Sequence, residues 1–447
     1  MSDRFVVLGL ARSRQRWFSE LARWSTNAVI PVEYVKCLTA DEARAVIGSG
    51  RRLSAVLIDA GVPRFDRELI ALATAVGAAT VVVNDPAVQR DWESLGCAAM
   101  LSSEFGPEDL LAALTRHAHP VDRSQRRVGR ATLTGETEVA SAPLIGVTGP
   151  GGTGASTIAM GLAQGLGQLQ PDRRVALADG ARAGDMAMYH DVGDVIPGLP
   201  ELVEAHRTDQ PDPDEIRRML FSIDERTYHL LLGQRRARDA AAMRPGSVRA
   251  ALQGLQRSFD LVILDHDAEL DGESETGSVD IEDHHALNRS TAFTAELVLL
   301  VGRPGVKGVN DLIRLIDCYV ELGVPRDRLV PVVNLAPRSP ASRAATTRAL
   351  AELTRPVDTA GTPCAAPLFV RNIRSMEEVH RSAGRLPDAL TQPLARAVRR
   401  LLLDVGVRNH STATTAHPIR PGDLGVDDRR AHRGISHHRS TTRSDVA

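Results

Sequence analysis

The sequence predicts an α/β protein made of two doubly wound domains, each with a mainly parallel sheet. Apolar segments of strand length alternate with amphipathic segments of helix length along residues 1–118 and again along residues 143–407. This alternation is typical of parallel sheets covered by helices on both faces. Residues 119–142 are polar and rich in small side chains, which predicts a flexible linker. From residue 408 to residue 447 the periodicity is lost, and a tail rich in Ser, Thr, Arg and His predicts disorder.

The first domain is expected to contain strands and helices in strict alternation, beginning with a strand. The expected strands are residues 4–10, 32–38, 54–61 and 79–85. The expected helices are residues 14–24, 41–50, 66–76 and 109–117. The strands are short and nearly continuous in apolar residues, as strands buried on both faces are.

The second domain repeats this pattern over a longer stretch. The expected strands are residues 144–149, 174–179, 259–265, 295–302 and 329–335. The expected helices are residues 160–169, 311–322 and 390–405. A strongly acidic insertion at residues 269–283 is predicted to be a surface loop with no assigned role. Five histidines occur after residue 409 at irregular spacing, which favours a solvated tail over a metal site.

Composition excludes several classes of function. A formal net charge of −2 and an aromatic content of 3% predict neither a specific nucleic-acid partner nor a base-stacking surface. The four cysteines are far apart in sequence, so neither a zinc site nor a disulfide framework is expected, and a reducing cytoplasm fits best. No segment approaches the ~20 apolar residues that span a bilayer, so membrane association is expected to be peripheral and through partners.

A glycine-rich turn between the strand at residues 144–149 and a helix is the strongest local signal. The run Gly149-Pro-Gly-Gly-Thr-Gly-Ala-Ser156 matches the phosphate-loop pattern G-x-x-x-x-G-K-[ST] at every element except the lysine. Glycines allow backbone N–H groups to face a phosphate, and the helix that follows adds its positive N-terminal end. The loop residues predicted to contact a nucleotide are Gly149, Gly151, Gly152, Thr153, Gly154, Ala155, Ser156 and Thr157.

This loop resembles the deviant phosphate loop of the MinD/ParA family, which has the pattern K-G-G-x-G-K-[ST]. In that family the first lysine reaches across a dimer interface and the second contacts the β and γ phosphates. Here Pro150 and Ala155 occupy the two lysine positions. The chain has only two lysines, Lys36 and Lys307, among 54 basic residues, yet a simple exchange of lysine for arginine would have left arginine at these two positions.

Three further segments resemble the same family in order, and the resemblance covers about residues 143–407. Asp179 corresponds to the first acid of the switch region, whereas the middle acid, which positions attacking water, is replaced by Ala181. Asp265 ends the segment that resembles the Walker B strand, where with Ser156 it would hold Mg²⁺. Asn334 lies where the family places an asparagine that contacts adenine.

The resemblance implies ATP or ADP with Mg²⁺ as the cofactor, bound weakly or not at all. Charge-assisted contacts to phosphate are among the strong ones, so loss of the lysines should lower affinity. Loss of the carboxylate at Ala181 removes a group that positions water, so efficient ATP hydrolysis is not expected and no catalytic residue is assigned. Substitution of the lysines by Arg182 or Arg303 from another direction remains open.

The first domain resembles a response-regulator receiver of flavodoxin-like fold. Asp59 ends the third strand, where receivers are phosphorylated, and Asn84 corresponds to the usual Thr or Ser. The acidic pair expected after the first strand is absent, and the expected lysine falls near Ser103. Without the acids that hold Mg²⁺ and the lysine that binds the phosphoryl group, a pseudo-receiver used for docking or dimerisation is favoured over a phosphoacceptor.

A receiver-like domain followed by a MinD/ParA-like domain resembles the arrangement of the CpaE/TadZ proteins. The resemblance implies a homodimeric scaffold that positions a Tad/Flp pilus or septum-site assembly and that is recruited to the pole, the septum or the inner face of the membrane by protein partners. One alternative is a ParA-type partition ATPase acting on nonspecific DNA. Another is a signalling protein phosphorylated at Asp59.

Overall fold

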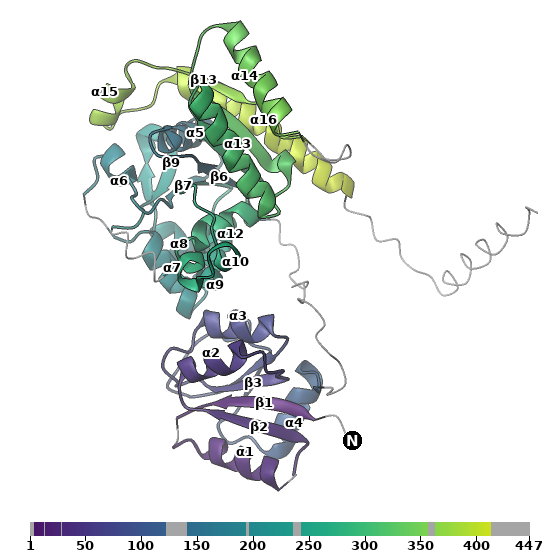
Figure 1. Cartoon of the computed structure of the whole chain (residues 1–447). Helices are drawn as coiled ribbons and strands as arrows, with labels where there is room; N and C mark the ends of the chain where they lie inside the picture. Colours follow the sequence, from purple (N-terminus) through teal and green to yellow (C-terminus); the bar gives the residue numbers. More distant parts are fainter. Residues whose placement is uncertain are drawn as a thin grey trace, which may run out of the picture. The chain divides into compact units, whose positions relative to one another are not determined.

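The computed structural model describes residues 4–12, 14–27, 29–121, 141–193, 196–235, 243–355 and 363–412, with backbone alone for residues 273, 274, 279 and 405–412. These residues form two α/β regions, each built on its own sheet (Figure 1). The predicted linker lies outside the described residues except at its two ends, and so does the predicted tail beyond residue 412. Within the described residues, no helix combines the length and apolar character needed to cross a bilayer.

The N-terminal sheet has five parallel strands in the order β2-β1-β3-β4-β5. This is the flavodoxin-like doubly wound order. The strands are β1 (Phe5–Leu10), β2 (Val32–Cys37), β3 (Ala55–Asp59), β4 (Ala79–Val83) and β5 (Ala99–Leu101). The helices are α1 (Arg16–Thr26), α2 (Ala40–Gly48), α3 (Arg67–Ala75) and α4 (Pro107–His117). The chain passes from β4 to β5 through turns at residues 84–98, without a helix.

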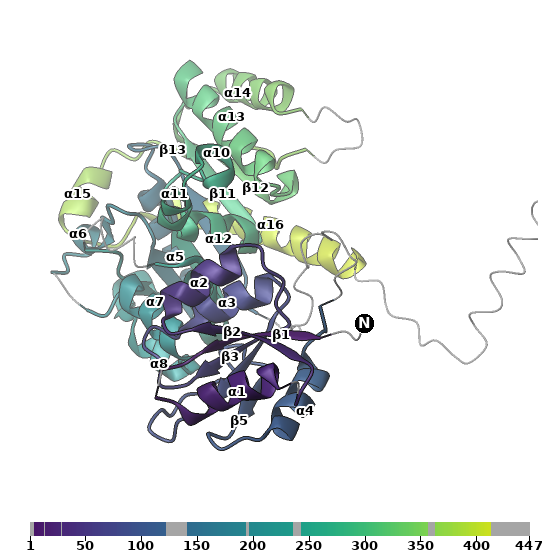
Figure 2. The ribbon, with the colours of Figure 1, turned by 60° about the horizontal axis from the view of Figure 1, so that its bottom comes forward.

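Helices cover both faces of this sheet, with α2 and α3 on one face and α1 and α4 on the other (Figures 1 and 2). Alternate residues of β1 point to opposite sides, because successive side chains of a strand face opposite ways. Leu8 therefore packs in the core with Ile47 of α2. Val7 packs in the opposite core with Trp17 of α1.

The C-terminal sheet has eight strands in the order β13-β12-β11-β6-β10-β7-β9-β8, and every pairing is parallel except β8 with β9. The strands are β6 (Leu144–Thr148), β7 (Val175–Asp179), β8 (Phe221–Ile223), β9 (Tyr228–Leu231), β10 (Leu261–Asp265), β11 (Leu297–Gly302), β12 (Leu329–Ala336) and β13 (Leu368–Arg371). The predicted α/β class with mainly parallel sheets is confirmed.

Helices cover both faces of this second sheet as well (Figure 1). They are α5 (Ala155–Leu169), α6 (Met186–Tyr189), α7 (Leu199–Thr208), α8 (Pro213–Arg218), α9 (Pro245–Ser258), α12 (Ala286–Thr294), α13 (Val306–Glu321), α14 (Pro340–Leu353), α15 (Met376–Arg381) and α16 (Asp388–Thr412), with 3₁₀ turns at Asp224–Arg226 and Arg326–Arg328. The acidic insertion was predicted to be a loop, and this is wrong in part, because it forms α10 (Glu273–Thr276) and α11 (Val279–His284). Ser278 accepts a hydrogen bond from the Ile281 N–H and so caps α11.

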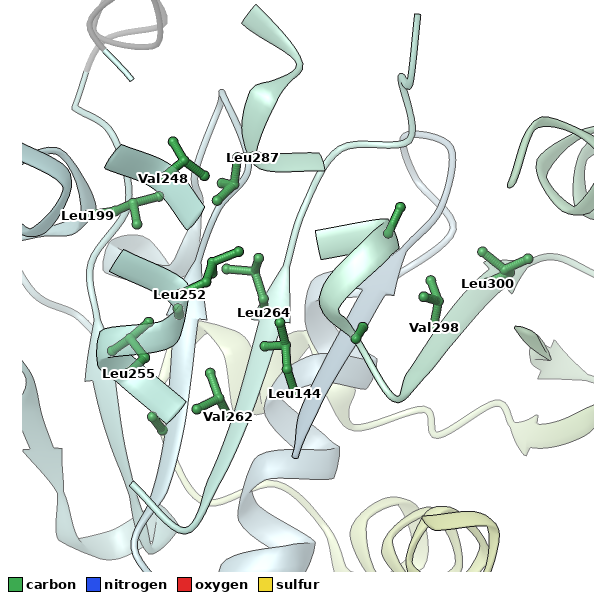
Figure 3. Close-up of a cluster of buried hydrophobic side chains, with 14 of the residues drawn as sticks. Leu144, Leu199, Val248, Leu252, Leu255, Val262, Leu264, Leu287, Val298 and Leu300 are labelled. Carbon is green, nitrogen blue, oxygen red and sulfur yellow. The ribbon is translucent and has the colours of Figure 1, made fainter. Parts of the chain in front are cut away.

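Aliphatic side chains fill the space between the sheet and its helices. Leu144 of β6 and Val262 and Leu264 of β10 point towards α9, where Leu252 and Leu255 meet them (Figure 3). On another side of the domain, α5 packs closely against α16, since a Cβ added to Gly165 would lie 2.4 Å from the backbone oxygen of Thr391. These contacts fix β6 and α5, the two elements that flank the glycine-rich turn.

Candidate functional site

The glycine-rich turn lies at the carboxyl end of β6, near the middle of the eight-stranded sheet. Strand β6 pairs with β10 on one side and β11 on the other, and the chain crosses from one side of β6 to the other between those strands. In open parallel sheets, ligands bind outside the carboxyl ends of the strands at such a switch point. The topology therefore places residues 149–156 where a ligand is expected.

The turn has the backbone conformation that only glycine adopts easily. Gly152 has φ +78° and Gly154 has φ +84°, both in the left-handed region. A Cβ on Gly149 would lie 2.3 Å from the backbone oxygen of Val301, so this position admits no side chain. No side chain caps the N-terminus of α5 at Gly154, which leaves the first N–H groups of the helix available to an anion.

A cavity of about 440 Å³ opens over the turn, and its charged lining is almost entirely acidic. All the loop residues from Gly149 to Thr157 line it. Four carboxylate side chains also line it: Asp185, Asp265, Asp267 and Glu269. Neither lysine nor arginine lines the cavity in the described part of the chain; the groups there that can carry positive charge are His266 and His380.

Asp265 and Asp179 lie side by side at the ends of β10 and β7, as neighbours in the sheet. Burial, followed by the charge of Asp179, raises the pKa of Asp265 to about 8, although the Ser156 hydroxyl donates a hydrogen bond to its carboxylate. Burial likewise raises the pKa of Asp179 to about 7, against the hydrogen bond that it accepts from the Met186 N–H at 3.1 Å. Without a cation beside them, burial therefore favours the protonated forms of both acids.

The donor set fits Mg²⁺ in part. Ser156 and Asp265, the two predicted metal ligands, are hydrogen-bonded to each other, and hydroxyl and carboxylate oxygens are ligands that Mg²⁺ prefers. In the described regions, no group of three or more His, Cys, Asp or Glu residues is arranged to hold a metal ion. An ion at this site would therefore take its remaining ligands from water and from phosphate oxygens of a nucleotide.

The residues of the switch region divide between this cavity and the buried interior. Ala181 and Asp185 line the cavity, whereas Asp179 lies behind it and binds the start of α6. Arg182 does not line the cavity; its guanidinium lies 3.7 Å from the Asp267 carboxylate. Arg303 is exposed and is absent from the lining too. Neither arginine occupies the place of the missing lysines.

A second, smaller hollow of about 170 Å³ adjoins the loop on the side of β12 and β13. It shares Gly152, Thr153, Gly154 and Thr157 with the first cavity, and Asn334 lines its wall. The Asn334 amide donates to the backbone oxygen of Thr153 at 2.8 Å, and its oxygen accepts from the Leu335 N–H at 2.9 Å. Asn334 therefore also stabilises the phosphate loop through Thr153. The prediction that it contacts adenine did not include this hydrogen bond.

Sequence reasoning missed several residues of the cavity, and three polar ones come from the loop after a strand or from a late helix. Asp267 and Glu269 follow β10, and the carboxylates two and four residues after Asp265 are a signal that was available. His380 comes from α15, more than 200 residues from the loop in sequence, and its Nε2 lies 3.1 Å from the Thr157 hydroxyl. No local pattern predicts that contact.

In the N-terminal sheet, Asp59 is 3% exposed at the end of β3. Its carboxylate accepts from the Gly61 N–H at 3.0 Å and from the Trp17 indole at 3.5 Å. Burial raises the pKa of the Asp59 carboxyl, although these two hydrogen bonds lower it. The charge of Asp85 also raises this pKa. The Trp17 indole is thus in direct contact with the carboxylate that receivers phosphorylate.

No protein-family model matches the chain, and no curated protein does. Solved structures similar to it include a ParA family ATPase from Chlorobium tepidum TLS, with 17% identity over 58% of this chain and 99% of that chain and a TM-score of 0.47. The septum site-determining protein MinD complexed with Mg-ADP from Pyrococcus horikoshii OT3 has 17% identity over 61% and 99%, with a TM-score of 0.41. The MinC:MinD cell division protein complex of Aquifex aeolicus has 15% identity over 62% and 99%, with a TM-score of 0.41. These neighbours are MinD/ParA-type proteins, and at such values the likeness carries no argument about what this chain binds.

Proposed function

We propose that the region of residues 143–407 is a MinD/ParA-like nucleotide-binding scaffold that hydrolyses ATP poorly or not at all. The observation that carries the proposal is a glycine-rich turn with two left-handed glycines and an uncapped helix N-terminus, facing a cavity without lysine or arginine among its described lining residues. The loop supports binding of phosphate through backbone N–H groups. The acidic wall opposes a polyphosphate unless Mg²⁺ enters with it.

The same cavity argues against rapid turnover. Ala181 provides no carboxylate to position water, and Ala155 provides no cation to stabilise charge on the transferred phosphoryl group. A cation of that kind is worth ~10³ to 10⁵ in rate in related phosphoryl transfers. Binding would then act by assembly: nucleotide between two copies of the chain would stabilise a homodimer.

The N-terminal region of residues 1–118 would act as a pseudo-receiver that presents a docking surface. The burial of Asp59, which contacts the Trp17 indole, supports a binding role over phosphotransfer. Together with the order of the two regions along the chain, this supports a role like that of the CpaE/TadZ proteins, in which a cytoplasmic dimer positions a pilus or septum-site assembly through protein partners. The same proposal includes residues 119–142 as the linker between the two regions and residues 408–447 as a tail.

The test is a calorimetric titration of the full chain with ATP and ADP, with and without Mg²⁺, together with its mass in solution. Calorimetry or a labelled nucleotide is needed because all three tryptophans, Trp17, Trp24 and Trp92, lie in the N-terminal region. We expect Mg²⁺-dependent binding, a dimer stabilised by nucleotide and negligible turnover. Brisk ATP hydrolysis that is lost in Asp265→Asn would refute the scaffold proposal, and ATP-dependent, salt-sensitive DNA binding would favour the partition alternative.

A further inference from the structure

The phosphate-loop cavity has few groups that could balance the charge of an anionic ligand. Four carboxylates line the cavity, and of the described lining residues only His266 and His380 can become cations. A phosphate group that enters such a site needs a compensating positive charge, because contacts between ions in a partly desolvated site are strong.

His266 is unsuited to that task. It is 2% exposed, and its Nδ1 lies 2.9 Å from the backbone oxygen of Asp267. Its Nε2 faces β6, since a Cβ added to Gly146 would lie 3.1 Å from it. Gly146 lies inside the strand, three residues before the loop begins, so this nitrogen points into the sheet.

His380 is placed at the start of α5, where an anion would bind. Its Nε2 lies 3.1 Å from the Thr157 hydroxyl, in the first turn of the helix. Its ring packs on that of Tyr189, with centroids 4.5 Å apart and planes inclined by 47°. Both rings line the cavity, so the imidazole lies beside the first turn of α5, with its Nε2 at the Thr157 hydroxyl and its Nδ1 buried without a hydrogen-bond partner among the described residues.

A buried arginine fixes the two segments that carry this ring pair. Arg226, 1% exposed, donates to the backbone oxygen of Tyr189 at 3.0 Å and to that of Gly384, beyond α15, at 3.2 Å. It also approaches the Met160 sulfur of α5 at 3.3 Å. Segments from α6 and α15 are thereby tied to the helix whose N-terminus they face, which orders the imidazole before any ligand arrives.

We propose that His380 supplies the positive charge of this phosphate-binding loop, taking a proton when an anionic phosphate group enters the cavity and so replacing the two absent lysines. The proposal rests on the proposed nucleotide-binding function. The ligand chemistry is a phosphate or diphosphate group, free or as part of a nucleotide. His380 is a binding residue here and has no assigned part in chemistry.

The groups around His380 set its protonation in the empty protein. Burial, and then the charge of Arg226, lower the pKa of His380, while Glu377 on the same helix raises it. Tyr189, which packs on the ring, is held neutral at physiological pH because burial raises its pKa. The free histidine is therefore mainly neutral at pH 7, and an adjacent phosphate dianion shifts it towards the charged form.

The experiment is a calorimetric titration of the full chain with Mg-ADP and, separately, with pyrophosphate, at pH 6, 7 and 8. Two buffers of different ionisation enthalpy count the protons taken up. With pyrophosphate, which brings no Mg²⁺ to displace protons from the Asp179–Asp265 pair, we expect uptake of up to one proton per bound ligand and affinity that rises on acidification by up to about tenfold per pH unit, the limit for one linked proton. His380→Gln should abolish this dependence and weaken binding at pH 6, and His380→Lys should restore binding without it. The matched control His284→Gln changes a histidine on α11 that does not line the cavity.

Four outcomes would overturn the inference. The pH dependence could persist in His380→Gln and vanish in Asp265→Asn, which would assign the proton to the acidic pair. Tighter binding by His380→Gln would mean that the histidine obstructs the loop. Absence of binding by the unmodified protein at every pH would refute the nucleotide-binding proposal itself, whereas binding that His380→Gln leaves unchanged would refute this inference alone. Pyrophosphate binding without ADP binding would identify a free anion as the ligand.

Discussion

Restoring a lysine to the phosphate loop is the most direct perturbation of the proposed site. Ala155 is the first residue of α5 and lines the cavity, and its side chain is only partly buried. In the variant Ala155→Lys, an ammonium group would lie in the cavity that holds Asp265 and Asp267. The same group would stand beside any phosphate bound at the helix N-terminus.

The expected gain follows from the strength of charged hydrogen bonds. A hydrogen bond to a charged group contributes about 1.5–3 kcal/mol, which corresponds to an affinity for Mg-ADP about 10- to 100-fold tighter. The new ammonium group should also lower the raised pKa of Asp265, because an opposite charge nearby favours the ionised form. Turnover should stay low, since Ala181 still provides no carboxylate.

The assay is a calorimetric titration of the full chain with Mg-ADP, and the matched control is Ala155→Met, which adds a side chain of similar length without charge. If Ala155→Lys binds no more tightly than Ala155→Met, the loop does not hold phosphate and the reasoning from its backbone is wrong. If both variants lose binding, the added side chain blocks the cavity, and the loop is too closed to serve a nucleotide.

Three other predictions test the packing, the buried acids and the N-terminal region. Gly165→Ala should destabilise the protein by about 1–3 kcal/mol in urea denaturation, because its Cβ would meet the Thr391 carbonyl at 2.4 Å, whereas Gly193→Ala, which has no atom within 4 Å, should be nearly neutral. Folding raises the pKa of Asp265 to about 8 and of Asp179 to about 7 from about 3.9 in the unfolded chain, so their contribution to stability is complete below about pH 4 and is lost as the pH rises to 8. Asp265→Asn should accordingly raise the thermal midpoint in metal-free buffer at pH 8, and a shift that fails to shrink towards pH 5 would contradict this. Acetyl phosphate should leave the mass of the protein unchanged, and a phosphoryl adduct at Asp59 would disprove the pseudo-receiver interpretation.

The sequence was sufficient for the features that depend on local spacing. Alternating strands and helices predicted both parallel sheets, and the run from Gly149 to Ser156 predicted a glycine turn between β6 and α5. Asp265 was correctly expected at a strand end, because a buried run that stops at an acid places that acid at the sheet edge. The prediction of a loop for the acidic insertion was wrong in part, because its charge was taken as evidence for a loop. Short capped helices carry charge equally well.

Contacts between distant segments were beyond such reasoning. Asn334 donates to the loop at Thr153, and His380 reaches Thr157 from a helix near the end of the domain. Arg226 ties together Tyr189 and Gly384, which lie on either side of it in sequence. Each contact depends on the order in which strands and crossovers are laid beside one another, and no periodicity in a single window encodes that order.

These contacts lead to a specific view of how the missing lysines are tolerated. The wall that would face Mg²⁺ keeps its acids. Burial raises the pKa of Asp265 in that wall to about 8 and that of Asp179, which lies behind the cavity, to about 7, which favours their protonated forms in the empty protein. A nucleotide alone meets repulsion from that wall, and a metal alone finds too few ligands among the described side chains. Binding of the metal and binding of the nucleotide favour each other. Phosphate oxygens complete the coordination of the metal, and the charge of the metal balances the negative charge of the carboxylates. Metal and nucleotide should therefore bind more tightly together than apart, and a strong thermodynamic coupling between them is the property that this lysine-free loop predicts.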